Sequence, residues 1–396
     1  MHSLRSPAAL LCATVLAAGC VRPSEQAFDP ATVLPADTTV AYVEYVNGSD
    51  RDLLAPWLPD GLTFPATADA VSPQAAIRRP DGTHTWVAIP ADGRSWTLPE
   101  ELASSGSLRL AASPSFRRVR SARISPAWLY VAAASPSAPV GAGRALGIDW
   151  TQESVRVAID AAFPTMRPVA PAPLILGEVA HAMIAREAVA PLAALLRPDI
   201  ATVLEALART AAARLLGADA IDIGRAHDIG VQLVDRPTGR RLLVTARSPD
   251  ASGDAESLHA LLRSRLVPAR HTVREFDDGK FLSAISLDPQ SITSDRYTSS
   301  GWTIATTQQG DRLLATAARG GLLLASDDAG LLRAALALPA SGVTSFASGR
   351  LLRSVLPPSL ALLLSPLLPP SGDIAWSVLV RDGVLMLEVL TAGPWY

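Results

Sequence analysis

The chain has 396 residues, with 35 basic and 37 acidic side chains and a net charge of −2. This balance gives no basic field for nucleic acid, so we expect no nucleic-acid partner. A composition that is 49% hydrophobic and 18% charged allows a large buried core and excludes a largely disordered chain. At this length, two closely packed subdomains are expected.

Residues 1–19 have the pattern of a secretory signal peptide. Arg5 precedes an uncharged, mostly apolar run at residues 7–18, which is the order of charged and hydrophobic segments in such signals. The run is too short to cross a membrane, which needs about 20 apolar residues, and it ends in small residues. We therefore expect this segment to be cleaved.

The sequence VLAAGC at residues 15–20 resembles the lipobox of bacterial lipoproteins, although the position three before the cysteine holds Ala17 where Leu is commoner. The resemblance implies cleavage before Cys20 and attachment of a diacylglyceryl group to its thiol. The other cysteine, Cys12, lies in the cleaved part, so Cys20 would be the only thiol of the mature chain, and lipidation accounts for it. The alternative is an ordinary secretory signal that leaves Cys20 free.

The lipobox resemblance also implies a location in the bacterial cell envelope. Two or three acyl chains on Cys20 would hold the protein on a membrane permanently. Lipoproteins without Asp directly after the cysteine are sorted to the outer membrane in enteric bacteria, and this chain has Val21 there. Residues 20–34 are polar and contain prolines, so we interpret them as a lipidated tether, on either the periplasmic or the surface face.

Residues 35–147 are predicted to form an N-terminal α+β subdomain. Alternating apolar residues indicate short strands, at residues 39–46, 75–79, 83–89, 107–112 and 128–134. The turn Pro80-Asp81-Gly82 indicates a hairpin, and residues 50–58 fit a short helix. The Pro-, Ser- and Gly-rich stretch 135–147 is interpreted as the connection to the second subdomain, residues 148–396.

The second subdomain is predicted to begin with long helices and to continue mainly in hairpins. Apolar residues at helical spacing indicate helices at residues 174–196, 199–216, 255–266 and 328–338. Turn signals indicate hairpins that pair residues 230–234 with 242–246, 273–276 with 281–285, and 376–380 with 385–390. The expected fold class is therefore α+β, with antiparallel sheets built from hairpins and packed helices.

A strand that leads directly into a helix is expected more than once, at residues 108–119 and 322–333 and more loosely at 241–266. This pattern is compatible with duplicated α+β units. The opening Leu-Pro-Ala-Asp at residues 34–37 before a strand, together with the strand at 321–326 and its helix, resembles a family of uncharacterised bacterial envelope proteins. The resemblance implies a duplicated α+β architecture and no particular function.

One set of residues has the spacing of a metal site. Glu178 and His181, and likewise Glu256 and His259, lie three residues apart, which places each pair on one face of a helix. Glu153 and Glu205 precede the pairs in the order used by di-iron bundles. Prolines follow Glu153, however, and strands are predicted between the two pairs, so no four-helix bundle can form. We interpret these residues as surface groups and expect no metal.

Other catalytic motifs are absent from the sequence. Lys280, the only lysine, lies in a predicted hairpin turn that matches neither a P-loop nor a Ser-x-x-Lys motif. There is no Gly-x-Ser-x-Gly elbow, and a lipidated Cys20 cannot be a nucleophile. The glycines at 141, 143 and 147 are interpreted as linker residues, and the histidines at 227 and 271 as turn or surface residues. No catalytic residue and no cofactor are therefore assigned.

Three functions remain open from the sequence. The leading hypothesis is a noncatalytic binding or scaffolding module on the membrane, whose envelope-protein partner would meet an exposed apolar patch. The second is a carrier of lipid or another hydrophobic ligand that uses the Ala- and Leu-rich helices predicted at 174–216. The third is a hydrolase with dispersed residues.

Overall fold

The computed structural model describes most of the chain between Phe28 and Ala392. The described residues are 28–44, 50–65, 73–90, 96–103, 108–133, 138, 143–161, 163, 175, 177–195, 202, 228–266, 269–287, 292–337, 345–356, 358–369 and 371–392. The expected signal peptide and Cys20 lie outside these residues. Within the described part, no helix is both long enough and apolar enough to span a membrane.

Strands dominate the chain, and most are short. They are β1 (Thr39–Glu44), β2 (Gln74–Arg78), β3 (His84–Ala88), β4 (Trp128–Val131), β5 (Leu146–Trp150), β6 (Ser154–Ile159), β7 (Glu178–Ala185), β8 (Asp228–Arg236), β9 (Gly239–Arg247), β10 (Ala269–Glu275), β11 (Phe281–Leu287), β12 (Thr293–Ser299), β13 (Trp302–Gln309), β14 (Arg312–Arg319), β15 (Leu322–Ser326), β16 (Ala347–Leu351), β17 (Asp373–Arg381) and β18 (Val384–Ala392). The α-helices in the described part are α2 (Arg51–Leu54), α3 (Pro114–Ser121), α4 (Arg186–Ala193), α6 (Ala251–Leu266), α7 (Ala329–Ala337) and α8 (Pro358–Leu364).

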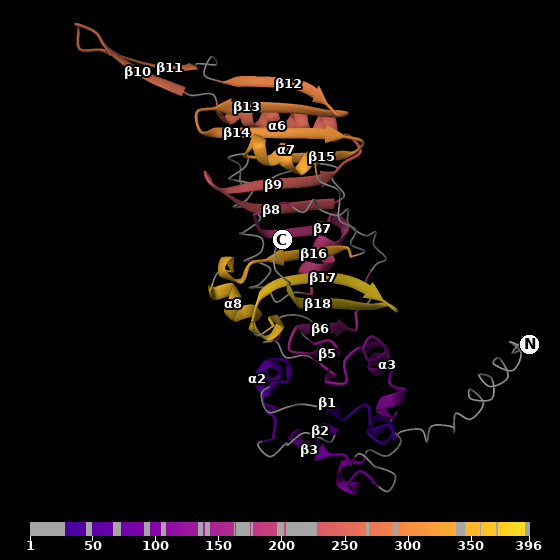
Figure 1. Cartoon of the computed structure of the whole chain (residues 1–396). Helices are drawn as coiled ribbons and strands as arrows, with labels where there is room; N and C mark the ends of the chain where they lie inside the picture. The colour runs from indigo at the N-terminus through magenta and orange to yellow at the C-terminus, as the bar shows by residue number, and fades with distance from the viewer. Residues whose placement is uncertain are drawn as a thin grey trace, which may run out of the picture.

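Sixteen strands form one continuous sheet, in the order β12-β13-β14-β15-β9-β8-β7-β16-β17-β18-β6-β5-β4-β1-β2-β3 (Figure 1). Every neighbouring pair is antiparallel. The order interleaves distant parts of the chain, because β16, β17 and β18 lie between β6 and β7, and β7, β8 and β9 lie between β15 and β16. The expected α+β class is therefore wrong. The fold is predominantly β, with helices on the surface of one large sheet.

The helix expected at residues 174–196 is also wrong in its first half. Residues Glu178–Ala185 form strand β7, and the helix α4 begins only at Arg186. In the sheet, β7 pairs with β8 on one side and β16 on the other. Neither partner is close in sequence, so this pairing overrides the helical preference of an Ala-rich segment. Most of the helix expected at 199–216 lies outside the described residues.

The hairpins predicted from turn residues are confirmed as β2–β3, β8–β9, β10–β11 and β17–β18. The helices expected at 255–266 and 328–338 correspond to α6 and α7. The boundary expected at residue 147 falls within β5, which pairs with both β4 and β6.

The helices α6 and α7 cover opposite faces of the sheet at one end. Leu314 and Ala318 of β14 pack with α6, whereas Ala315 and Ala317 pack with α7. Because side chains alternate between the faces of a strand, β14 is buried on both sides. We call residues 239–337, from β9 to α7, the distal end.

The other end of the sheet, residues 28–161, is the proximal end. Its core holds a cluster of buried aromatic rings on β1, α3 and β4: Tyr42, Phe116, Trp128 and Tyr130. Phe28, the first described residue, packs against the same core. The polar tether expected to precede the folded domain would therefore join the proximal end.

Candidate functional site

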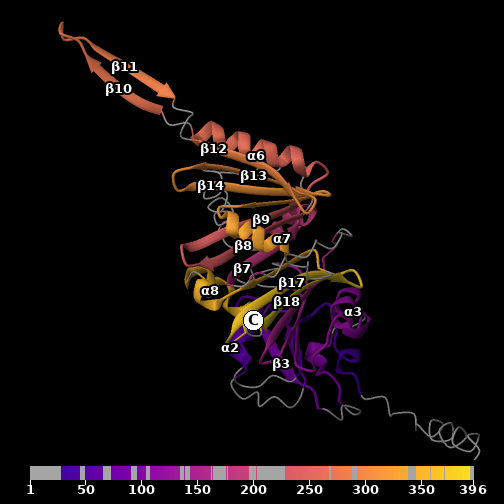
Figure 2. The same cartoon turned by 45° about the horizontal axis from the view of Figure 1, so that its top comes forward.

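A separate hairpin made of β10 and β11 projects from the distal end, beyond the edge strand β12, in both views (Figures 1 and 2). Val273, Phe276, Phe281 and Leu282 on this hairpin are each more than 40% exposed. Soluble proteins rarely gather large apolar side chains at one exposed site unless that site binds something. The hairpin is thus the first candidate for a binding surface.

The sequence of the hairpin explains both its turn and its two apolar faces. Gly279 adopts a φ of +74°, which glycine tolerates, and the N–H of Phe276 donates to the carbonyl of Lys280 at 2.8 Å. Lys280 pairs with Asp278 at 2.7 Å, so the lysine has the turn role expected from the sequence. Phe281 and Leu282 are adjacent in the strand and therefore emerge on opposite faces.

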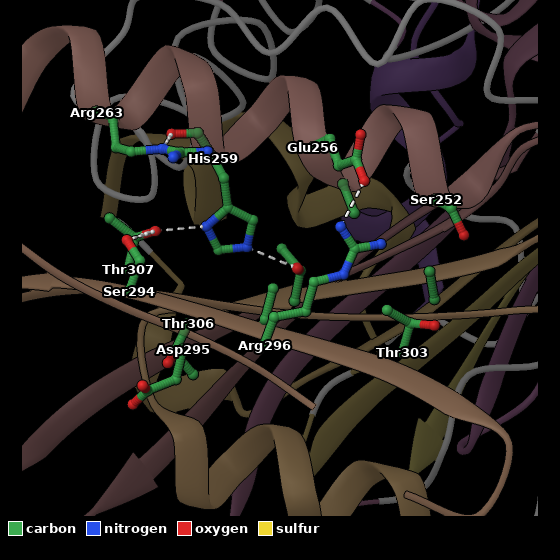
Figure 3. Close-up of a pocket in the computed structure, with 14 residues that line it drawn as sticks. Ser252, Glu256, His259, Arg263, Ser294, Asp295, Arg296, Thr303, Thr306 and Thr307 are labelled. Carbon is green, nitrogen blue, oxygen red and sulfur yellow. Dashed lines mark hydrogen bonds and ion pairs between the residues drawn. The ribbon is translucent and has the colours of Figure 1, made fainter. Parts of the chain in front are cut away.

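A pocket of about 250 Å³ lies between α6 and strands β12 to β14 (Figure 3). The residues that α6 contributes follow helical spacing, at Ser252, Ala255, Glu256, His259 and Arg263. The sheet contributes small or polar residues, among them Ser294, Arg296, Thr303, Ala305, Thr307, Thr316 and Ala318. The pocket lining therefore combines hydroxyl and charged groups with small alanine side chains.

His259 is fixed at one end of this pocket. Its Nδ1 lies 2.9 Å from the hydroxyl of Thr307 and its Nε2 lies 2.7 Å from the hydroxyl of Thr316. Burial, together with the positive charges of Arg263 and Arg296, lowers the pKa of His259 from 6.5 to about 4. The imidazole is therefore neutral at pH 7.

An ion pair crosses the pocket opening. Arg296 of β12 donates to the carboxylate of Glu256 on α6 at 2.7 Å, and both side chains are more than half exposed. The Nε of Arg263 donates to the carbonyl of His259 at 3.3 Å. Glu256 of α6 thus contacts the edge strand β12, whereas the buried His259 contacts the inner strands β13 and β14 (Figure 3).

The four residues with metal-like spacing behave differently from our expectation. Glu178 and His181 lie on a strand rather than on a surface helix, and a bulge between Glu178 and Ala180 lets both side chains meet. The Glu178 carboxylate is buried, contacts Nδ1 of His181 and accepts a hydrogen bond of 2.8 Å from Gln232. The interpretation of these residues as exposed was wrong for Glu178 and for His259, which is also buried.

The described residues do not bring the two Glu and His pairs together, since they contain no group of three or more His, Cys, Asp or Glu side chains that could hold a metal. Glu153 lies in the turn between β5 and β6, while Glu205 and the histidine at 227 are outside the described residues. Gly147 belongs to β5, where an added Cβ would come within 2.2 Å of Val119. Its role is therefore close packing.

Several residues of the candidate site could not be recognised in the sequence. Thr307, Thr316 and Arg296 reach the pocket only because β12, β13 and β14 pair in a particular register. The exposed Phe281 and Leu282 could have been noticed, because two large apolar residues directly after a hairpin turn have no buried face to fill. No family model, curated protein or solved structure matches this chain.

Proposed function

We propose that this protein is a lipid-anchored module of the bacterial cell envelope that binds a partner protein noncatalytically through the hairpin β10–β11. The observation that carries the proposal is the exposure of Val273, Phe276, Phe281 and Leu282 on one projecting element. Aromatic and aliphatic side chains of this kind form the buried centres of protein interfaces. The anchor is Cys20, on the basis of the lipobox-like sequence.

The long sheet supports a role as a spacer between membrane and partner. Sixteen strands at a spacing of about 4.8 Å extend roughly 70 Å. A lipid on Cys20 would join the proximal end, only eight residues before Phe28, and the hairpin lies at the opposite end. The apolar hairpin would then face away from the anchoring membrane.

The charge at the hairpin tip favours a protein partner over a lipid bilayer. Asp277 and Asp278 occupy the turn between Phe276 and Phe281. Insertion of the tip into lipid would carry these carboxylates into the apolar layer, which is costly. A protein groove can instead receive the apolar side chains laterally and leave the tip in water.

A photo-crosslinking experiment in cells tests this function. We expect a photoreactive phenylalanine at Phe281 of the full chain to form one major protein adduct, which disappears when Phe276 and Leu282 are changed to Ser. The same group at Leu362, an exposed apolar position on α8, is the matched control and should give no such adduct. Lipid adducts alone, or equal adducts at both positions, would contradict a protein-binding hairpin.

Labelling with a palmitate analogue tests the anchor separately. The wild-type chain should incorporate the label and fractionate with membranes, and Cys20→Ala should do neither. If the variant labels as strongly as the wild type, the anchoring part of the proposal fails and the hairpin part still stands.

The lipid-carrier hypothesis has no specific observation in its favour. The helix pair on which it depends is interrupted, because residues Glu178–Ala185 form β7. The apolar residues that line the pocket beneath α6 are small alanines, set among hydroxyl and charged groups, whereas sites for hydrophobic ligands are lined mainly by larger apolar and aromatic side chains.

A further inference from the structure

The pocket beneath α6 contains hydrogen-bonding groups that the fold does not use. The hydroxyls of Ser252 and Thr303 lie on opposite sides of it, one on the helix and one on β13 (Figure 3). Neither hydroxyl has a hydrogen-bond partner within the part of the chain that the structure describes. Both can therefore donate to a ligand without breaking an existing bond.

Arg296 also has unused capacity towards the pocket. Its guanidinium carries five N–H groups, and the ion pair with Glu256 engages it through one terminal nitrogen. A planar guanidinium is suited to bidentate contact with a carboxylate or a phosphate. The remaining edge of Arg296 is available for such a contact.

The charges around the pocket favour an anion. Arg263 and Arg296 bring two positive charges, Glu256 brings one negative charge, and His259 is neutral at pH 7. Asp295 also belongs to the pocket lining and brings a second negative charge, but its side chain points away from α6 and Arg296 (Figure 3). Both arginines also contribute to the lowered pKa of His259 at the buried end of the pocket.

Small side chains leave the space that a ligand needs. Ala255, Ala305 and Ala318 form part of the lining, and the open volume is about 250 Å³. Larger residues at these positions would pack α6 directly on the sheet, as a close-packed core does elsewhere. The open space thus lies next to the hydroxyls of Ser252 and Thr303, which have no partner in the described part of the chain.

We propose that this pocket binds a small ligand through an oxyanion group, a carboxylate or a phosphate, held by Arg296 and the hydroxyls of Ser252 and Thr303. Glu256 competes with the oxyanion for Arg296. When no ligand is bound, the Glu256–Arg296 pair closes the pocket opening. The site is distinct from the hairpin and does not depend on the partner proposed above.

Titration of the full chain with inorganic phosphate, and separately with acetate, tests the site by NMR of the His259 ring. We expect at least one of the two anions to bind saturably and to raise the pKa of His259. Binding should weaken at least tenfold in Arg296→Gln and strengthen several-fold in Glu256→Gln, because the competing carboxylate is gone. A response to one anion alone identifies which oxyanion the pocket prefers.

Arg312→Gln is the matched control, since Arg312 is an exposed arginine of β14 outside the pocket lining. Amide spectra of each variant report whether the fold is kept, and Arg296→Lys retains the charge without the bidentate geometry. The proposal is overturned if neither anion binds saturably, or if Arg296→Gln behaves like Arg312→Gln. Equal binding in Glu256→Gln and the wild type would also overturn it.

Discussion

The two ends of the sheet are packed by different kinds of side chain. At the proximal end, the ring centroids of Tyr42, Phe116 and Trp128 lie 5.5 to 6.2 Å apart in edge-to-face contacts. At the distal end, α6 carries the buried His259 and faces small residues such as Ala305 and Ala318. Large rings fill the interior of the proximal end, and the hollow of about 260 Å³ beside Phe116 and Arg120 is more open to solvent. At the distal end, small side chains leave a more enclosed pocket between α6 and the strands. The same sheet thus combines an end packed by large rings with an end where an enclosed pocket separates a helix from the strands.

The largest expected effect concerns the aromatic cluster. Phe116→Ala removes a ring that is completely buried, so we expect the free energy of unfolding to fall by about 3–5 kcal/mol. Phe281→Ala on the hairpin should change it by less than about 0.5 kcal/mol, because that ring is exposed. Urea unfolding of both variants measures the contrast. Similar losses of stability in the two variants would contradict the contrast between a buried aromatic cluster and an exposed hairpin.

Acid is expected to loosen the distal end through His259. Its pKa is lowered from the ordinary 6.5 to about 4 in the folded state, so the unfolded chain takes up the proton first. Stability from the neutral imidazole is complete above pH 6.5 and is lost as the pH falls to about 4, by up to about 3 kcal/mol.

Hydrogen exchange at pH 7 and pH 4.5, with rates corrected for the intrinsic effect of pH, measures this loss. Peptides from α6 should lose protection, and peptides from α3 at the proximal end serve as the internal reference. His259→Gln should remove the difference between the two pH values in α6. An α6 that stays as protected as α3 would count against the proposed role of His259.

The proximal end should respond to pH in the opposite direction through Asp149. Burial raises the pKa of this carboxyl to about 6, and only one of its oxygens has a partner, the N–H of Ile124 at 3.0 Å. The folded state therefore binds the proton more tightly than the unfolded state, and stability is lost as the pH rises through about 6.

Replacement by Asn tests this behaviour, because Asn is never charged. We expect Asp149→Asn to stabilise the protein at pH 8 by roughly 1–2 kcal/mol, less than the full pKa effect because the new amide lacks an acceptor. The gain should vanish at pH 4, as thermal melts at both values would show. A variant that is less stable than the wild type at pH 8 would indicate that the charged form is favoured.

The smallest expected effect is that of the ion pair across the pocket. Both Arg296 and Glu256 are more than half exposed, so Glu256→Gln should change the free energy of unfolding by less than about 1 kcal/mol. The measurement is urea unfolding at low and at high salt. A larger loss of stability would mean that the ion pair holds α6 on the sheet. The pocket at the distal end would then be closed by a strong contact.

Local elements were predictable from the sequence, and the way they assemble was not. Turns such as Asp277-Asp278-Gly279 and Pro237-Thr238-Gly239 specify their hairpins through neighbouring residues, and those hairpins are confirmed. The strand Glu178–Ala185 depends on partners far away in the chain, so its Ala-rich pattern indicated a helix. The α+β class failed for the same reason, because pairings such as β15 with β9 carry no local signal.

The candidate site was predictable to a similarly limited extent. Glu256 and His259 were recognised as one side of a helix, but the burial of His259 depends on Thr307 and Thr316 of two other strands. Lys280 was correctly placed in a turn. Spacing alone could not reveal that Glu178 and His181 meet across a strand bulge, because a regular strand places residues three apart on opposite faces.

The position of β18 has a consequence for how the chain folds. Arg156 of β6 contacts Glu388 of β18 across 232 residues of sequence, and the C-terminal strands fill the gap between β6 and β7. During synthesis the middle of the sheet cannot close until β17 and β18 have been made, and contacts this distant in sequence slow folding. A chain that loses residues 373–392 would keep two unpaired strand edges, which are templates for aggregation. Complete pairing of the central strands therefore depends on β17 and β18.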